Sequence, residues 1–151
     1  MNNSLLGFLA LIGGLIMCTL FGCHAPAPQS TGVTQGQLAP CPDSPNCVSS
    51  QAQKKSQKVD PIAMAEPLAT AKAKMKTILN QLGQNKIVQE DPNYLHVEFT
   101  SMIFRFVDDI EFYFDTDHKL IHLRSASRTG RYDFGVNRKR MNDINFRYIQ
   151  M

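Results

Sequence analysis

The feature that most constrains the fold is the repeat of hydrophobic residues between Lys86 and Ser127, which has a period of two. This period is typical of β-strands, because successive side chains of a strand point to opposite faces of the sheet. The breaks between the apolar runs are short and contain turn-forming residues such as Pro92, Asn93 and Asp117. Connections this short join antiparallel neighbours, so the sequence predicts a four-stranded antiparallel meander. Its strands are predicted at residues 86–91, 94–101, 104–115 and 120–127.

Before and after the predicted strands, apolar residues recur at the three- and four-residue intervals that are typical of a helix. From Glu66 to Leu82 apolar residues recur at intervals of three and four, Pro67 suits the first turn, and Gly83 suits the position just past the end. A second helix is predicted over residues 137–149. The predicted fold is therefore α+β in the order α-β-β-β-β-α, with the two helices packed on one face of the meander and polar residues on the other.

The N-terminal segment, residues 1–22, contains no charged residue and is predicted to target the chain to a membrane or to span one. Its end, Leu20 to Cys23, resembles the lipobox of bacterial lipoproteins, in which the cysteine is acylated and becomes the new N-terminus. Cys23 is therefore the predicted site of lipid attachment. Phe21 is bulkier than usual for a lipobox, and no early Lys or Arg is present, so an uncleaved anchor remains the alternative.

Two further cysteines, Cys41 and Cys47, would remain in the exported part of the chain. Thiols in an oxidising compartment usually pair, so a disulfide is predicted in place of half a zinc site or a catalytic thiol pair. Residues 23–40 are rich in Pro, Ala, Gln, Gly and Thr and are predicted to be a disordered tether. With 151 residues and 43% hydrophobic content, the chain supports one core, which we place in a single domain at residues 41–151.

One acidic residue interrupts the apolar face of the third predicted strand. Asp108 falls in line with Ile110, Phe112 and Phe114, whereas Asp109 falls on the polar face. An unpaired carboxylate among apolar side chains costs several kcal/mol, so we expect Asp108 to pair with an arginine from residues 124–138. The residues that this segment offers to such a cluster are Arg124, Ser125, Ser127, Arg128, Asp133, Asn137 and Arg138.

Three motifs, CPDSPNCVSS, FRFVDDIEF and RSASRTGRYDFGVNRKR, occur in this order in the chain. Together they resemble a family of bacterial exported proteins described as domain of unknown function 1499, over about residues 40 to 150. The resemblance implies an exported, commonly lipid-attached protein, and it implies no particular reaction. The family pattern falls on Cys41, Pro42, Ser44, Pro45, Asn46, Cys47, Ser49, Phe106, Asp108, Asp109, Arg124, Ser125, Ser127, Arg128, Gly130, Asp133, Gly135, Asn137 and Arg138.

Three interpretations of the polar cluster remain open from the sequence. The cluster binds an anionic group, such as a lipid phosphate or an envelope glycan, through Arg128 and Arg138 with Asp108 and Asp133 orienting them. Alternatively, Asp108 or Asp109 acts beside Ser125 or Ser127 in a hydrolase, although no G-x-S-x-G or H-E-x-x-H motif is present. In the third interpretation the cluster is a structural buttress, in which Asp108 holds Arg128 or Arg124 and so pins the final helix to the sheet. The hydrolase is further disfavoured because His96, His118 and His122 are predicted to be exposed strand and turn residues.

We expect a lipid-anchored binding or envelope-associated module and lean against an enzyme. The predicted partners are a membrane, reached through the lipid anchor, and an anionic lipid or envelope component. His24 stands in place of aspartate after Cys23, and its resemblance to the lipoprotein sorting rule of enteric bacteria implies the outer membrane over the inner one in a Gram-negative host. The net charge of +3 is spread over several segments, so nucleic acid is not an expected partner, and no cofactor or metal is expected.

Overall fold

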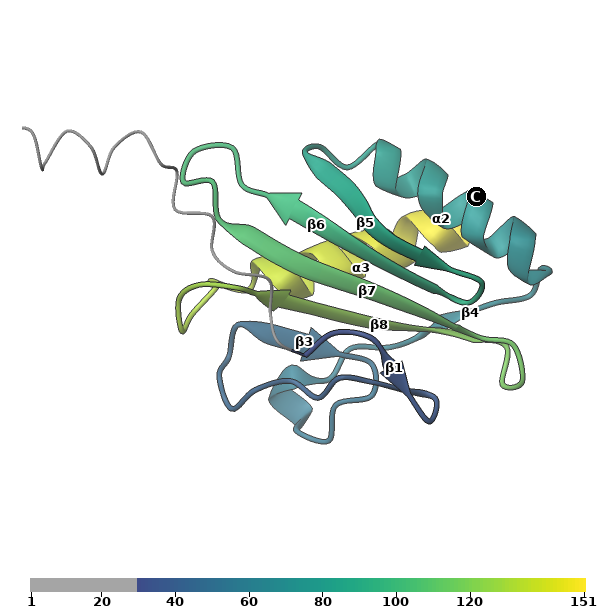
Figure 1. Ribbon diagram of the computed structural model, residues 1–151, viewed down its shortest axis with the longest axis horizontal. Helices are drawn as coiled ribbons and strands as arrows, with labels where there is room; N and C mark the ends of the chain where they lie inside the picture. The colour runs from purple at the N-terminus through teal and green to yellow at the C-terminus, as the bar shows by residue number, and fades with distance from the viewer. Residues whose placement is uncertain (1–29) are drawn as a thin grey trace, which may run out of the picture.

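The computed structural model describes residues 30–151, which fold around one antiparallel sheet (Figure 1). The predicted targeting segment, residues 1–22, and the predicted lipid-attachment residue, Cys23, lie outside these described residues. In chain order the elements are β1 (Val33–Thr34), β2 (Gln37–Leu38), β3 (Cys47–Ser49), the 3-10 helix η1 (Lys55–Gln57), β4 (Ile62–Ala63), α2 (Leu68–Asn80), β5 (Asn85–Asp91), β6 (Tyr94–Thr100), β7 (Val107–Asp115), β8 (Leu120–Ser127) and α3 (Val136–Gln150).

The predicted meander is present, but it is part of a larger sheet. Strands β5 to β8 pair with their sequence neighbours, and β3 and β4 both pair with β8, which gives a 6-stranded sheet in the order β3-β8-β7-β6-β5. The prediction of four strands was therefore wrong in number, and α2 is preceded by strands instead of opening the domain. β3 and β4 span only 3 and 2 residues, which is too short for a period of two to be recognised.

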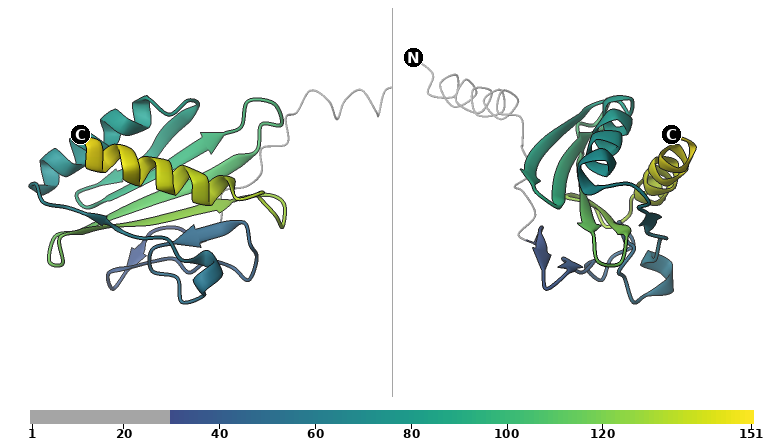
Figure 2. Two further views of the ribbon diagram at one scale, coloured as in Figure 1. Left: turned by 180° about the vertical axis from the view of Figure 1, so that it is seen from behind. Right: turned by 90° about the vertical axis from the view of Figure 1, so that its right-hand side faces the viewer.

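Helices α2 and α3 cover the same face of the sheet (Figure 2). Ile110, Phe112 and Phe114 of β7 point to this face and are each 0% exposed. They pack with apolar residues of β6 and β8 and with the buried stripes of the helices, which include Met75 and Ile144. Truncating a core residue such as Phe112 to alanine would cost about 3–5 kcal/mol, so the packing on this face contributes strongly to the stability.

The first described residues lie against the opposite face of the sheet instead of continuing as a tether. β1 and β2 form a hairpin whose turn residues, Gln35 and Gly36, have φ values of 51° and 74°. Positive φ at both central positions is typical of a two-residue hairpin turn. The backbone N–H of Gly32 donates to Glu111 of β7 at 2.7 Å, and the N–H of Leu38 donates to Gln51 at 2.8 Å. Residues 32–38 were predicted to belong to a disordered segment because few of them are apolar. In the structure they are ordered, because hydrogen bonds to Glu111 and Gln51 hold them in place.

The predicted disulfide between Cys41 and Cys47 is confirmed. It closes the loop that leads into β3, and β3 pairs with the C-terminal half of β8. Neither α2 nor α3, the α-helices of the described residues, combines the length and hydrophobicity that a membrane-spanning helix needs.

Candidate functional site

The Asp108 side chain lies on the helix-covered face, as its place in the alternation predicts, but its partner is not an arginine from residues 124–138. Arg140 of α3 donates from Nη2 to Asp108 Oδ2 at 2.8 Å. Arg140 lies one helical turn after Asn137 and points to the same face of α3, where it also donates to Asn137 Oδ1 at 2.9 Å. The expected pairing is therefore corrected to Asp108–Arg140, with both side chains largely buried.

Asn137 is the centre of the polar contacts on this face and is 0% exposed. Its Oδ1 accepts from the Ser125 hydroxyl, and its Nδ2 donates to Ser127 Oγ and to the Asn46 carbonyl, each at 3.0 Å. Asn46 in turn donates to the carbonyl of Gly130 at 2.6 Å. These bonds connect α3, β8 and the disulfide loop, and they satisfy polar groups that burial would otherwise destabilise. We call Asp108, Arg140, Asn137, Ser125, Ser127 and Asn46 the helix-face network.

Asp133 and Arg138 do not act as predicted. Asp133 accepts hydrogen bonds from the backbone N–H groups of Gly135 at 3.0 Å and Asn137 at 2.9 Å, so it stabilises the start of α3 instead of orienting an arginine. Arg138 donates to the carbonyls of Lys58 and Ser56, each at 2.6 Å. These bonds fasten α3 to the segment around η1.

Arg128 lies on the opposite face of the sheet from Asp108. Its Nε and Nη2 form a two-pronged contact with Asp109, each at 2.8 Å, and Nη2 also donates to Glu98 of β6. The Asp109 carboxylate, 0% exposed, also lies 2.6 Å from Nε2 of His96. The expectation that His96 is an exposed strand residue was wrong, because its side chain is buried in this contact.

These contacts perturb the ionisation of the groups that make them. Burial alone would raise the pKa of Asp109, but hydrogen bonds from Arg128 and His96 outweigh burial and hold that pKa below its ordinary value. Hydrogen bonding to Asp109 raises the pKa of Arg128 further above its ordinary range. Both side chains therefore remain charged and bound to each other across the neutral range.

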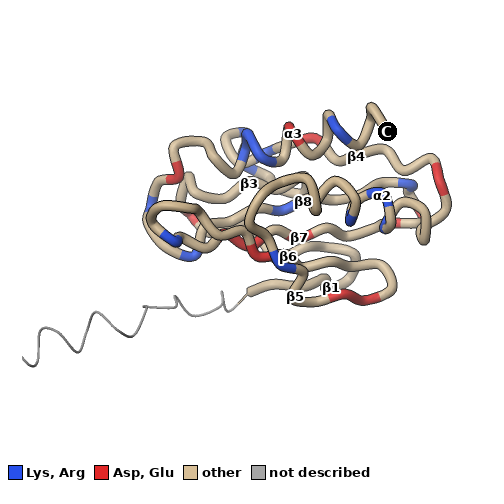
Figure 3. The backbone as a smooth tube through the Cα atoms, turned by 90° about the horizontal axis from the view of Figure 1, so that it is seen from above, with Lys and Arg blue, Asp and Glu red and all other residues tan. Residues whose placement is uncertain are grey.

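A second group on this face is built around Glu111. Its carboxylate accepts from Arg124 at 2.5 Å, from the Tyr94 hydroxyl at 2.7 Å and from the Gly32 N–H at 2.7 Å. Burial, together with the adjacent Glu111 charge, raises the pKa of Tyr94 well above its ordinary value, so Tyr94 remains a donor. We call Glu98, Asp109, Arg128, His96, Glu111, Arg124 and Tyr94 the open-face network. Figure 3 shows that acidic and basic positions both occur along the chain, on the strands as well as on the helices and loops.

The sequence prediction thus combined residues that the sheet separates. Asp108, Ser125, Ser127 and Asn137 belong to the helix-face network, whereas Asp109, Arg124 and Arg128 belong to the open-face network. The structure adds members that were not predicted: Tyr94, His96, Glu98 and Glu111 in the open-face network, and Arg140 and Asn46 in the helix-face network. The alternation already placed His96, Glu98, Asp109, Glu111 and Arg124 on one face, and the cross-strand register of β6, β7 and β8 would have paired them.

The chemistry available to both networks is limited, because most of their polar atoms already have partners within the protein; the buried Nε of Arg124 is an exception. Arg124, Arg128 and Arg140 each bind a carboxylate of the chain itself, so a ligand anion would have to displace it. Ser125 is 0% exposed and donates to Asn137, which makes it inaccessible as a nucleophile. Within residues 30–151 no three His, Cys, Asp or Glu side chains come close enough together to hold a metal ion. The networks are suited to holding the sheet, α3 and the loops in place.

Exposed apolar side chains lie on two loops. Figure 1 shows both loops at the same end of the sheet. The β6–β7 loop, residues 101–106, exposes Met102, Ile103 and Phe104 by 78%, 82% and 71%. The loop between β8 and α3, residues 128–135, exposes Tyr132 by 62% and Phe134 by 88%. The predicted strand start at Phe104 was wrong: β7 begins at Val107, so Phe104 and Phe106 lie in the loop and not on the apolar face.

Each loop is fixed at its base and carries an aromatic pair. In the first, the Ser101 N–H donates to the Phe106 carbonyl at 2.8 Å and the Phe106 N–H donates to Ser101 Oγ at 2.9 Å. Phe104 and Phe106 stack with ring centroids 5.5 Å apart. In the second, Tyr132 and Phe134 meet edge to face at 5.3 Å. We call these two segments the apolar loops.

The fold and these networks define a class: an α+β domain with a disulfide, helices on one face of an antiparallel sheet and buried ion pairs on the other. The chain belongs to the family described as "Protein of unknown function (DUF1499)", whose model matches residues 37–146. A search of curated proteins found no match to the chain, and a search of solved structures found none either.

Proposed function

We propose that the protein is a lipid-anchored envelope protein whose domain rests on an anionic lipid bilayer, with the apolar loops in the membrane interface. The observation that carries this proposal is the exposure of Met102, Ile103, Phe104 and Phe134, each at 71% or more, at one end of the sheet. Scattered exposed apolar residues are ordinary, but a local group of this size indicates a contact surface. Aromatic and long apolar side chains are the residues that favour the bilayer interface.

Charge around the loops supports an anionic bilayer as the partner. Arg105 and Arg131 lie within the two loops and Lys139 lies in the first turns of α3; all three are exposed. Among residues 30–151 none of the three has a carboxylate within ion-pair distance. A Lys or Arg near an anionic membrane surface contributes about 1 kcal/mol, so these side chains complement lipid phosphates. The anionic group expected from the sequence is then a lipid headgroup, contacted by loop cations and not by the buried arginines.

The two networks have a structural role in this proposal. The N–H of Arg128, at the base of the second loop, donates to the carbonyl of Val107, at the base of the first, at 3.0 Å. Asn46 holds the carbonyl of Gly130. Loops held in this way present their apolar side chains with little loss of conformational entropy on binding. The uncharged segment at residues 1–22 and the lipobox-like Cys23 supply a second membrane signal, and stable anchoring generally takes two.

A single-tryptophan experiment tests the proposal, because the chain contains no tryptophan of its own. Phe104→Trp is introduced into the full chain, which is reconstituted in vesicles of phosphatidylcholine and phosphatidylglycerol that include brominated lipid. We expect blue-shifted emission and strong quenching. The matched control is Phe146→Trp, since Phe146 is 63% exposed on α3 and lies outside the loops. This control should emit as a solvent-exposed tryptophan with little quenching.

The electrostatic part is tested in the same reporter. Combining Arg105→Gln with Arg131→Gln, or raising the salt concentration, should reduce the quenching, because both weaken attraction to the anionic surface. Equal quenching of the Phe104→Trp and Phe146→Trp reporters would contradict contact through the loops. Quenching that persists unchanged in pure phosphatidylcholine would contradict recognition of an anionic lipid.

A further inference from the structure

A polar cleft lies beside the turn that joins β7 to β8. Figure 1 shows this turn at the end of the sheet opposite the apolar loops. The volume of the cleft is about 680 Å³, and its sides are the β1–β2 hairpin, the segment that follows β3 and the turn itself. The volume is within the range of roughly 300–1,000 Å³ that is usual for small-molecule sites. Neither the polar networks nor the apolar loops contribute to this cleft.

Two aromatic rings line the cleft side by side. Tyr113 of β7 and His122 of β8 are cross-strand partners on the open face of the sheet. Their rings are nearly parallel, 13° apart, with centroids at 6.0 Å, and both side chains are half-buried. Burial lowers the pKa of His122, which favours its uncharged ring at neutral pH. The pair thus offers an extended aromatic surface to a ligand in the cleft.

Hydrogen-bonding side chains surround this surface without being committed elsewhere. Gln35, Gln37, Gln53, Lys58 and Asp117 line the cleft and are exposed. Within the described part of the chain their side chains make no hydrogen bond to protein. Each glutamine amide is both donor and acceptor, and Lys58 and Asp117 add one donor group and one acceptor group of opposite charge.

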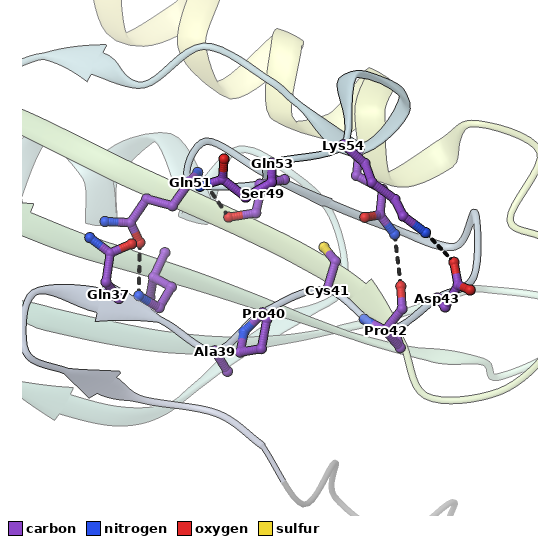
Figure 4. Close-up of a pocket in the computed structure, with 13 residues that line it drawn as sticks. Gln37, Ala39, Pro40, Cys41, Pro42, Asp43, Ser49, Gln51, Gln53 and Lys54 are labelled. Atoms are coloured by element: carbon purple, nitrogen blue, oxygen red, sulfur yellow. Dashed lines mark hydrogen bonds and ion pairs between the residues drawn. The ribbon is translucent and has the colours of Figure 1, made fainter.

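A neighbouring groove of about 400 Å³ beside the disulfide provides a contrast (Figure 4). Apart from Gln37 and Gln53, most of its polar side chains already have partners: Gln51 binds the backbone of Leu38 and Gly36, Gln57 binds the carbonyl of Pro42, and Lys54 pairs with Asp43. No aromatic side chain lines it. The groove therefore has less to offer a ligand than the cleft, although the two share Gln37, Gln51 and Gln53.

We propose that the cleft binds a carbohydrate chain. The C–H face of a sugar ring packs on aromatic rings, and its hydroxyl groups both donate and accept, as the glutamine amides do. The cleft does not carry a strong charge of one sign, because Asp115 binds His118 at 2.8 Å and the lining residues Lys58 and Asp117 carry one charge of each sign. A peptide is a poorer match, since Leu120 is the one aliphatic side chain in the lining and no pocket is available for apolar peptide side chains.

The placement of the cleft is compatible with membrane contact but does not depend on it. Contact of the apolar loops with a bilayer would leave the opposite end of the sheet, and the cleft, open to the envelope. Loss of one activity by mutation should therefore leave the other intact, and the two proposals can fail separately.

Binding is measured with the full chain in detergent micelles, by calorimetric titration and saturation-transfer NMR with N-acetylglucosamine tetrasaccharide and with maltotetraose. We expect one or both to bind, with Tyr113→Ala weakening the affinity about tenfold or more because the aromatic surface is lost. Gln53→Ala should weaken it by a smaller factor. The matched control, Tyr132→Ala, removes an exposed tyrosine at the other end of the sheet and should bind as the wild type does.

Circular dichroism and thermal unfolding establish that each variant is folded, and Gln53→Ala keeps the test informative if Tyr113→Ala unfolds. Absence of binding by the wild type to both tetrasaccharides would overturn the proposal. Binding that Tyr113→Ala and Gln53→Ala leave unchanged would also overturn it, because the sugar would then occupy another place.

Discussion

Asp108 and Asp109 are neighbours in the sequence, yet the two faces of β7 give them different environments. Asp108 shares the helix-face network with Arg140, and their side chains are 14% and 16% exposed. Asp109 lies in the open-face network, where its side chain is 1% exposed and that of Arg128 is 5% exposed. The helix-face network is mostly neutral amides and hydroxyls with one ion pair at its edge. The open-face network is mostly charges, so its stability depends on complete pairing.

The largest effect is expected from breaking the deepest ion pair of the open-face network. Arg124→Leu removes the cation from Glu111, whose side chain is 0% exposed, and should destabilise the domain by about 3–5 kcal/mol. Urea unfolding of the full chain in detergent micelles measures the change. Adding Glu111→Leu should recover part of the loss, because the uncompensated charge is then gone. A double variant no more stable than Arg124→Leu would show that packing, not charge pairing, dominates.

The direct comparison of the two faces is Asp109→Asn against Asp108→Asn. The first should cost about 2–3 kcal/mol, because a buried charge-assisted contact to Arg128 and His96 is lost. The second should cost about 1 kcal/mol, since the amide can still accept from Arg140 and water reaches the edge of that pair. The free energies of unfolding of the two variants and the wild type, measured under the same conditions, test this difference. Equal losses would mean that the faces do not differ as their burial indicates.

Removing the disulfide is expected to have a smaller effect, which should be confined to the helix-face network. Replacing Cys41 and Cys47 together by serine should cost about 2 kcal/mol, because the closed loop is short. The same change should loosen Asn46, whose carbonyl accepts from Asn137 in the helix-face network. Hydrogen exchange should therefore increase at the start of α3 and stay unchanged at β6 and β7. Increased exchange in β6 would show that the two networks are coupled.

The smallest expected effect is the contribution of Asp109 to the loss of folding stability at acidic pH. The pKa of Asp109 is lower in the folded domain than its ordinary value of 3.8, so its contribution to stability is present above that value. The contribution is lost as the pH falls through the lower folded pKa. Stability of the wild type should decline more steeply on acidification than that of Asp109→Asn, and unfolding curves at a series of acidic pH values measure this. Parallel declines would assign the acid sensitivity to other carboxylates, such as Glu66 and Asp115, whose pKa values are also lowered.

The helix-covered half of the fold was predictable because its periodic hydrophobic patterns extend over many residues. The runs at 86–91, 94–101 and 120–127 agree closely with β5, β6 and β8, and the helix patterns agree with α2 and α3. The strand predicted from Phe104 was too long, since Phe104 and Phe106 continue the alternation although the chain already turns there. β3 and β4 could not be found, because strands of 3 and 2 residues leave no periodic pattern.

The candidate site was predictable only in part. The apolar neighbours of Asp108 indicated that it needs a cation as a partner. Arg140 could have been chosen only from its place three residues after Asn137, which puts both side chains on one face of α3. Burial of Asp109 and Glu111 could not be predicted, because alternation identifies a polar face without saying what covers it. Part of that cover comes from Gly32 and the β1–β2 hairpin, whose composition is that of a linker.

The hydrogen bond from Gly32 to Glu111 also determines where a mechanical load would enter the domain. If the N-terminal part of the chain is held at a membrane, tension reaches β7 in the middle of the sheet through this bond and through the small β1–β2 hairpin. Among the described strands, β1 and β2 pair with each other and with no strand of the large sheet, so the hairpin can be peeled away, and the bond to Glu111 broken, before the core strands separate. We therefore expect residues 30–38 to lengthen first under force, which would increase the reach of the domain while its core remains folded.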